Sequence, residues 1–133
     1  LSSAGISSLN LENEITQFFL TTEIIPSAGQ GIVALQCRDG DDEIINLLNN
    51  INHLPTYYCA IAERGVLKIL EGSCDTAVGV FAEIQNNEIK LEAELFSIDG
   101  NERYYEKKVK PIEFASELGG EVGKILKEKS NNS

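Results

Sequence analysis

Cys74 is the side chain of this 133-residue sequence with the clearest capacity for chemistry. It stands in ILEGSCDTAVGV, residues 69–80, in a turn of Gly, Ser, Asp and Thr between an apolar run and a strand-like run. Free cysteine normally packs in cores, but this turn offers it no apolar stripe. The nearby carboxylates of Glu71 and Asp75 suppress ionisation, which disfavours a freely reactive thiolate. Two interpretations stay open: a thiol that is derivatised once and remains so, or an incidental surface cysteine.

The other two cysteines give weaker signals. Cys37 lies in a β-like run and Cys59 in the first turns of a predicted helix, where cysteine is usually a small hydrophobe. An odd number of cysteines without paired spacing favours a reducing compartment, the cytoplasm, over a disulfide framework. Because the sequence has no CxxC and His53 is its single imidazole, it predicts no metal site and no catalytic triad.

The charge balance excludes one class of partner. The sequence has 21 acidic and 11 basic residues, a formal net charge of −10, so it offers no cationic face for nucleic acid. No apolar run approaches the roughly 18 to 20 residues of a membrane span. The arginines that could bind carboxylates are spread over three segments, so an anionic ligand needs cations from outside this chain. These arginines are Arg38, Arg64 and Arg103.

The first fifty residues predict few regular elements. Residues 1–21 predict the end of one helix and a short second helix, and the SAGQG stretch at 27–31 predicts a hinge or tight turn. The apolar run at 32–37 predicts a buried strand that must pair with something outside this chain or with another copy. A helix over 43–51 is predicted next, with Asp41 or Asp42 as its N-cap. The start without Met, on what resembles the tail of a helix, leads us to expect a processed or excised piece.

Two short motifs in this region match ligand-binding patterns only superficially. Residues 29–34 fit G-x-G-x-x-A, but a dinucleotide fingerprint needs a helix after the glycines and here a strand is predicted. Residues 39–43, DGDDE, lack the Glu that closes a calcium loop, because Asn50 occupies that place. Both are interpreted as turns.

Residues 54–133 predict a compact α+β unit. A helix over 57–70, capped by Thr56, is expected to expose Glu63 and Lys68. Alternating apolar residues then predict three strands joined by turns at Asn86-Asn87 and Asp99-Gly100, the third strand being a lysine-rich edge, and a closing helix follows. The prediction is a three-stranded antiparallel sheet covered on one face by helices. The expected apolar positions of the two helices are Tyr58, Ile61, Ala62, Val66 and Ile69, then Ala115, Leu118, Val122, Ile125 and Leu126.

Two long stretches resemble the porphobilinogen deaminase (hydroxymethylbilane synthase) family. They are IPSAGQGIVALQCR at 25–38 and HLPTYYCAIAERGVLKILEGSCDTAVGV at 53–80. The family patterns are PA-x-GQG-x-x-x-I-x-CR and T-x-x-x-x-x-AER-x-x-L-x-x-LEGGC-x-x-PIG. The likeness covers nearly the whole chain in order, but only the C-terminal part of the family enzyme.

The resemblance implies a transferase of heme and porphyrin biosynthesis, a cytoplasmic monomer. The family enzyme joins four porphobilinogen molecules into the linear tetrapyrrole hydroxymethylbilane and releases ammonia. It builds the chain on a dipyrromethane cofactor, held by a thioether to the cysteine of LEGGC, which by position is Cys74. Gln30 is implied to lie near the cofactor cleft or to be only a hinge residue. Since the catalytic carboxylate and most substrate-binding cations belong to the first two domains, no catalytic residue is expected in this chain.

The resemblance also implies a division of the chain. Residues 1–24 would end the second domain, 25–49 would return to the first as a hinge, strand and helix, and 54–133 would form the third, cofactor-carrying domain. Two positions depart from the family pattern: Ser73 replaces a glycine and Ala77 replaces a proline. They alter the stiffness of the turn but keep the thiol.

Two further hypotheses remain beside the transferase. A sheet flanked by helices also suits a non-enzymatic ligand-binding or interaction module, and a degenerate remnant would fold without performing chemistry.

Overall fold

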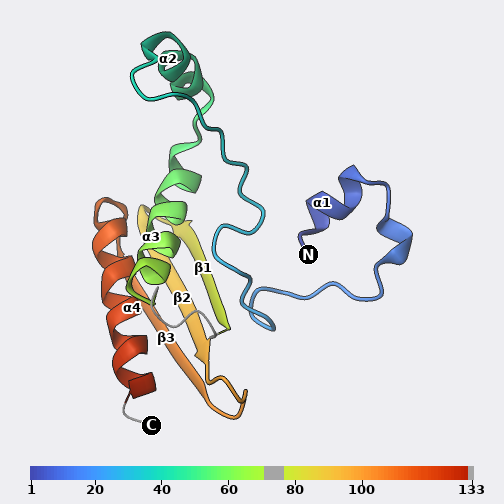
Figure 1. Cartoon of the computed structure of the whole chain (residues 1–133), viewed down its shortest axis with the longest axis vertical. Coiled ribbons are helices and arrows are strands. Elements are labelled where there is room, and N and C mark those ends of the chain that lie inside the picture. The colour runs from blue at the N-terminus through green and yellow to red at the C-terminus, as the bar shows by residue number, and fades with distance from the viewer. Residues whose placement is uncertain (71–76, 132–133) are drawn as a thin grey trace.

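The computed structural model describes residues 1–70 and 77–131 (Figure 1). Helices α3 and α4 lie side by side on one face of a small sheet, and the N-terminal residues extend away from them. The elements are α1 (Ser3–Ser8), η1 (Glu12–Glu14), α2 (Asp42–Ile51), α3 (Leu54–Leu70), β1 (Val78–Gln85), β2 (Glu88–Phe96), β3 (Arg103–Pro111), η2 (Ile112–Phe114) and α4 (Ala115–Asn131).

The sheet is an antiparallel meander in the order β1-β2-β3. Its first hairpin pairs Phe81 with Glu92 and turns at Asn86-Asn87, whose φ angles of 50° and 63° are those that a tight two-residue hairpin requires. The second turn has a left-handed Gly100, φ 72°. Both predicted turns are confirmed, and β3 is an edge strand as expected, since it pairs with β2 alone.

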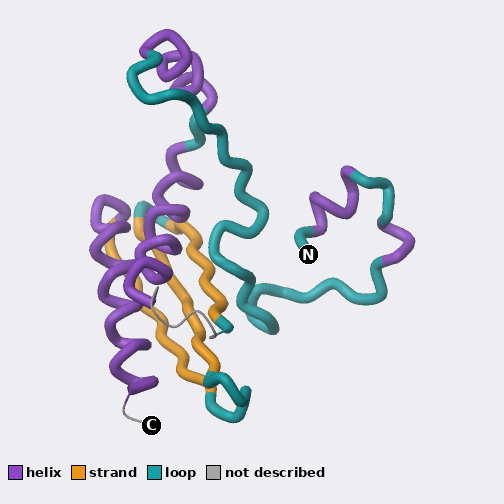
Figure 2. Tube along the Cα trace, in the orientation of Figure 1, coloured by secondary structure: helices purple, strands orange, loops and turns teal. Residues whose placement is uncertain are grey.

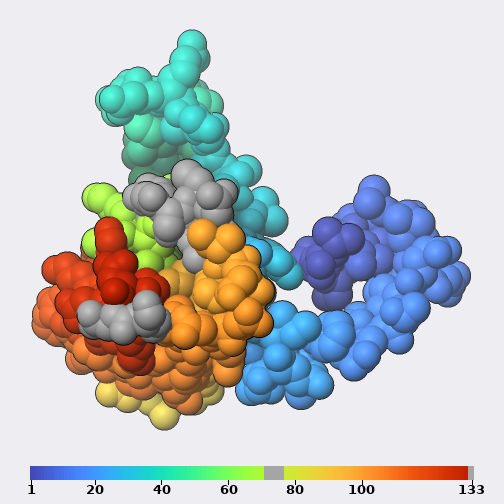
Figure 3. Space-filling model, turned by 60° about the horizontal axis from the view of Figure 1, so that its bottom comes forward, coloured from blue at the N-terminus to red at the C-terminus, as the bar shows by residue number. Residues whose placement is uncertain are grey.

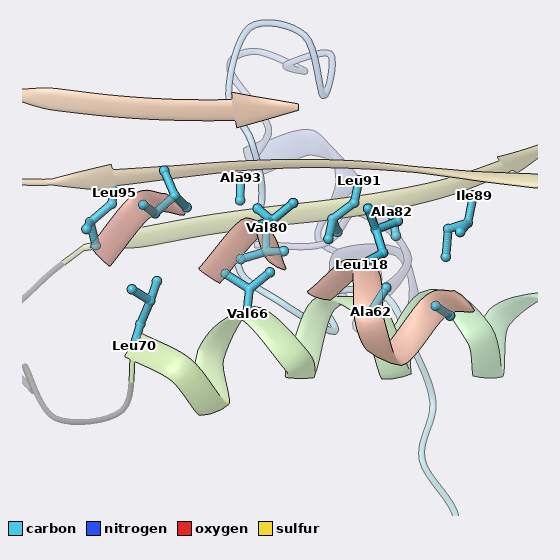
Figure 4. Packing of buried hydrophobic residues seen from close by; sticks show 13 residues of the cluster. Ala62, Val66, Leu70, Val80, Ala82, Ile89, Leu91, Ala93, Leu95 and Leu118 are labelled. Atoms are coloured by element: carbon cyan, nitrogen blue, oxygen red, sulfur yellow. The ribbon is translucent and has the colours of Figure 1, made fainter. Parts of the chain in front are cut away.

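One apolar layer holds sheet and helices together. Side chains from β1, β2, α3 and α4 point into the space between the sheet and the two helices (Figure 4). Each fully buried Leu, Ile or Val contributes about 1.5–3 kcal/mol relative to exposure. The predicted α+β fold, with one sheet face covered by helices, is confirmed. The largest fully buried side chains are Ile89, Leu91, Leu95, Leu118, Leu126, Val66, Val80 and Val122. We call α3, the three strands and α4 the C-terminal module.

The N-terminal forty residues contain less regular structure than predicted. Only α1 and the single turn η1 form before residue 15, and residues 15–20 form no helix (Figure 2). The strand predicted at 32–37, which was expected to pair with something outside this chain or with another copy, does not form here: those residues run without regular structure, and Val33 is 87% exposed. A strand needs a neighbour to accept its hydrogen bonds, and the described residues supply none here. In the space-filling view the N-terminal residues stand away from the body of the molecule (Figure 3).

One of the two predicted helix N-caps is confirmed and the other is wrong. Asp41 caps α2 as predicted, accepting a bond from the N–H of Ile44 at 3.4 Å. Thr56 does not cap α3, which begins two residues earlier at Leu54. Pro55 suits that first turn because its missing N–H would have no helical partner there. No helix among the described residues is long and apolar enough to cross a membrane.

Candidate functional site

The two ends of the Cys74 segment, residues 71–76, are fixed by the C-terminal module. Cys74 itself lies outside the described residues, so its predicted exposure stays a prediction. On one side α3 ends at Leu70, 7% exposed in the core. On the other side the carbonyl of Ala77 accepts the N–H of Phe96 at 3.0 Å, just before β1 begins. The segment therefore joins a helix end that is buried in the core to the start of an edge strand.

A groove of about 480 Å³ lies beside the start of β1. Residues between 22 and 27 form one wall, and residues 77–79 with Phe96 form another. Glu94 and Arg103 complete it from β2 and β3. The groove thus lies on the sheet face opposite the core, next to the end of the Cys74 segment.

An ion pair sets the electrostatics of this groove. Arg103 donates from Nε to Glu94 at 2.8 Å, and its guanidinium lies 5.3 Å from the ring centre of Tyr105. The Glu94 side chain is 9% exposed and that of Arg103 is 55% exposed. Because Arg has five N–H donors, Arg103 keeps donors that a ligand carboxylate could accept.

A pyrrole primer of the kind that the resemblance implies needs several cations for its carboxylates. Among the described lining residues of the groove, Arg103 is the one cation, and Glu94 already offsets part of its charge. This groove alone therefore lacks the cations that would bind all the carboxylates of such a primer. No set of three or more His, Cys, Asp or Glu side chains suited to a metal ion occurs within residues 1–70 and 77–131.

Gln30 lies exposed in a tight turn of what we call the crossing segment, residues 25–31. The N–H of Gln30 donates to the carbonyl of Ser27 at 3.0 Å, and the flanking Gly29 and Gly31 have φ angles of 75° and 83°. The predicted glycine turn is confirmed. Gln30 and Phe81 of β1 line a second groove, of about 850 Å³, between the N-terminal residues and the sheet.

Glu63 is a residue whose role the sequence did not reveal. It was expected in solvent, but it is 4% exposed, and its two oxygens accept backbone N–H groups of Gly29 at 2.6 Å and Ala82 at 2.9 Å. Burial raises its pKa above the ordinary value, and these two bonds act in the opposite direction. Spacing carried a signal: Glu63 shares a helical face with Val66 and Leu70, at i+3 and i+7.

Of the two described cysteines, Cys59 matches its expected role as a small hydrophobe in a helix, whereas the strand expected around Cys37 does not form. Cys59 packs against the core, and burial raises the pKa of its thiol, with Glu63 and Glu83 adding to the effect. Cys37 is half-buried and, like Cys59, is a free thiol. A raised pKa leaves less thiolate, so Cys59 is a poor nucleophile.

Two family models match the chain. The model for the porphobilinogen deaminase C-terminal domain matches residues 57–128, and the model for the porphobilinogen deaminase dipyromethane cofactor binding domain matches residues 1–46. The first covers most of α3, the sheet and most of α4. The second covers α1, the crossing segment and the start of α2, and its description names the cofactor that the resemblance implies.

Curated relatives agree with both models. Porphobilinogen deaminase of Desulforamulus reducens is 35% identical over 95% of this chain, that of Coxiella burnetii (strain Dugway 5J108-111) is 36% identical over 100%, and that of Alkaliphilus metalliredigens is 33% identical over 97%. The chain spans 41–43% of the length of these relatives. With more than half of its residues matched by the C-terminal domain model, the chain belongs to the porphobilinogen deaminase family.

Proposed function

We propose that this chain is the C-terminal part of a porphobilinogen deaminase and supplies the tether for the growing tetrapyrrole. Cys74 would hold a dipyrromethane primer through a thioether. When bound, that primer offers the pyrrole carbon to which the next porphobilinogen is joined, with loss of ammonia. The complete protein would release hydroxymethylbilane.

The observation that carries this proposal is the continuous likeness to porphobilinogen deaminases over nearly the whole chain. The ends of the Cys74 segment add physical support. A tether must stay in one place through repeated additions, and this segment starts from a buried helix end and enters a paired strand. A thioether also resists thiol exchange, so the primer would remain bound through every turnover.

The remaining machinery would come from the N-terminal part of the same protein. The chain carries 21 acidic and 11 basic residues, and this net negative charge disfavours binding of several substrate carboxylates. Most of its exposed large apolar side chains precede residue 55, including Phe18, Phe19 and Val33. Such side chains usually mark an interface. We propose that residues 1–24 close the second domain and 25–49 return to the first, in the reducing cytoplasm.

The experiment is an assay of porphobilinogen consumption and hydroxymethylbilane formation. The complete protein is expected to be active, its Cys74→Ala variant inactive but folded, and the 133-residue chain alone inactive. A fully active Cys74→Ala variant would overturn the role of the thiol. Turnover by the isolated chain would overturn the assignment of the catalytic groups to the N-terminal part.

A further inference from the structure

The outer edge of β1 is covered by groups from outside the sheet. Strand β1 has β2 as its neighbour on one side, which leaves alternate N–H groups pointing outward. The N–H of Val80 donates to the carbonyl of Pro26 at 2.7 Å, and the N–H of Ala82 donates to the Glu63 carboxylate at 2.9 Å. The crossing segment and one side chain of α3 therefore occupy an edge that would otherwise be open.

Glu63 joins three parts of the molecule. Its second oxygen accepts the N–H of Gly29 at 2.6 Å, so a single carboxylate on α3 binds both β1 and the crossing segment. Hydrogen bonds to an ionised carboxylate are stronger than neutral ones, and burial keeps water from competing. Removing this acceptor leaves two backbone donors without their partner.

Gly79 of β1 permits the close approach of the crossing segment to this strand. A Cβ at Gly79 would lie 2.7 Å from the carbonyl oxygen of Ile25 and 3.1 Å from the side chain of Glu94. Ile25 is 8% exposed at this contact. Two independent features therefore act on the crossing segment. The Glu63 carboxylate on α3 binds it, and the absence of a side chain at Gly79 on β1 leaves room for it.

We propose that Glu63 is a positioning residue, which docks the crossing segment on the C-terminal module and so fixes Gln30 relative to the strand that follows Cys74. The crossing segment follows directly on residues 1–24, and residues 32–53 lie between it and the start of this module. Docking of the crossing segment therefore sets where the C-terminal module lies relative to the preceding residues 1–24. The docking follows from geometry alone, whereas its consequence for turnover rests on the proposed function.

The first experiment is amide hydrogen exchange of this chain by NMR. Glu63→Gln keeps the shape of the side chain but replaces an acceptor oxygen by a donor. Because the remaining amide oxygen can accept only one of the two N–H groups, we expect the Gly29 amide, the Ala82 amide or both to exchange at least about tenfold faster, as loss of one charge-assisted bond implies. The amides of β2 should keep their protection, which distinguishes release of the segment from unfolding of the module. The matched control is Glu117→Gln, an exposed carboxylate paired with Lys110.

A second variant tests the same docking without touching the carboxylate. In Gly79→Ala the added Cβ would push the Ile25 carbonyl, and with it the crossing segment, away from β1. This variant should therefore also speed exchange of the Gly29 amide. Unchanged exchange rates of Gly29 and Ala82 in Glu63→Gln, with the Gly29 rate in Gly79→Ala also unchanged, would overturn the docking role. A faster rate in both variants, with β2 still protected, supports it.

The second experiment uses the complete protein. Glu63→Gln should lower kcat at least about tenfold while KM for porphobilinogen stays within about twofold, because misplacement affects the reacting geometry rather than substrate binding elsewhere. The primer on Cys74 should still be detected by mass spectrometry. An unchanged kcat in Glu63→Gln would overturn the catalytic consequence. A wild-type protein without primer or activity would instead refute the proposed function, and the exchange experiment would still decide the docking.

Discussion

Gly119 of α4 lies directly against Ala62 of α3, so close that a Cβ on Gly119 would collide with the Ala62 carbonyl oxygen. The same Cβ would lie 3.0 Å from the Cα of Gly65. These obstacles are backbone atoms and cannot rotate away. We predict that Gly119→Ala lowers the free energy of unfolding by about 2 kcal/mol or more, the usual cost of overpacking, despite the better helix propensity of alanine.

Gly120 provides a matched control in the same helix. A Cβ there meets nothing within 4 Å, so Gly120→Ala should raise the free energy of unfolding by up to about 1 kcal/mol. Urea unfolding of both variants measures the difference. Equal stabilities for the two variants would contradict the close helix contact.

The left-handed backbone of the Asn86-Asn87 turn leads to a second prediction, about thermal stability. Asn87 has φ 63°, a conformation that costs a β-branched residue about 1–2 kcal/mol and costs glycine nothing. We predict that Asn87→Val lowers the thermal midpoint by several degrees, whereas Asn87→Gly leaves it unchanged or higher. Calorimetry tests the order of the three proteins, and a Val variant as stable as the Gly variant would rule out this turn geometry.

The sequence predicted the C-terminal module well because each element carries its own signal. Alternation of apolar residues defined the strands, Asn86-Asn87 and Asp99-Gly100 defined the turns, and helical spacing defined the buried face of α4. These signals are local, so they do not depend on what surrounds the module.

Long-range contacts could not be predicted in this way. Glu63 is a charged residue on a predicted helix, and its burial depends on two N–H groups, of which that of Gly29 lies 34 positions away. The apolar run at 32–37 shows the opposite case: its composition is typical of a buried strand, yet no described residue pairs with it. Composition records the environment for which a segment was selected, which need not lie within this chain.

The Glu121 carboxylate gives a prediction about pH. It accepts bonds from Lys110 at 2.6 Å and Lys108 at 3.0 Å, which lower its pKa from 4.5 to about 2. A lowered acid pKa stabilises the fold above the unfolded value, and that contribution is lost as the pH falls from 4.5 towards 2.

Comparison with Glu121→Gln isolates this contribution. Over the same pH window the wild-type chain should lose more unfolding free energy than the variant, and the difference should shrink in high salt because the pairs are partly open to solvent. Urea unfolding at several pH values measures both slopes. Parallel slopes at low salt would show that these ion pairs do not stabilise the fold.

Cys59 is predicted to be unreactive in the folded chain. Burial and the nearby carboxylates of Glu63 and Glu83 raise its pKa, so less thiolate is present than in the unfolded chain. In a variant carrying Cys37→Ser and Cys74→Ser, alkylation near pH 8 should be several-fold slower without urea than with it. Equal rates would mean that Cys59 remains a competing attachment site.

The central claim is that Cys74 carries the pyrrole primer. Mass spectrometry of the complete protein, isolated from cells that make porphobilinogen, tests it most directly. We predict a covalent dipyrromethane on the peptide that contains Cys74, with the peptides of Cys37 and Cys59 unmodified. An active protein in which Cys74 is a free thiol, or in which the primer sits on another cysteine, would contradict the account.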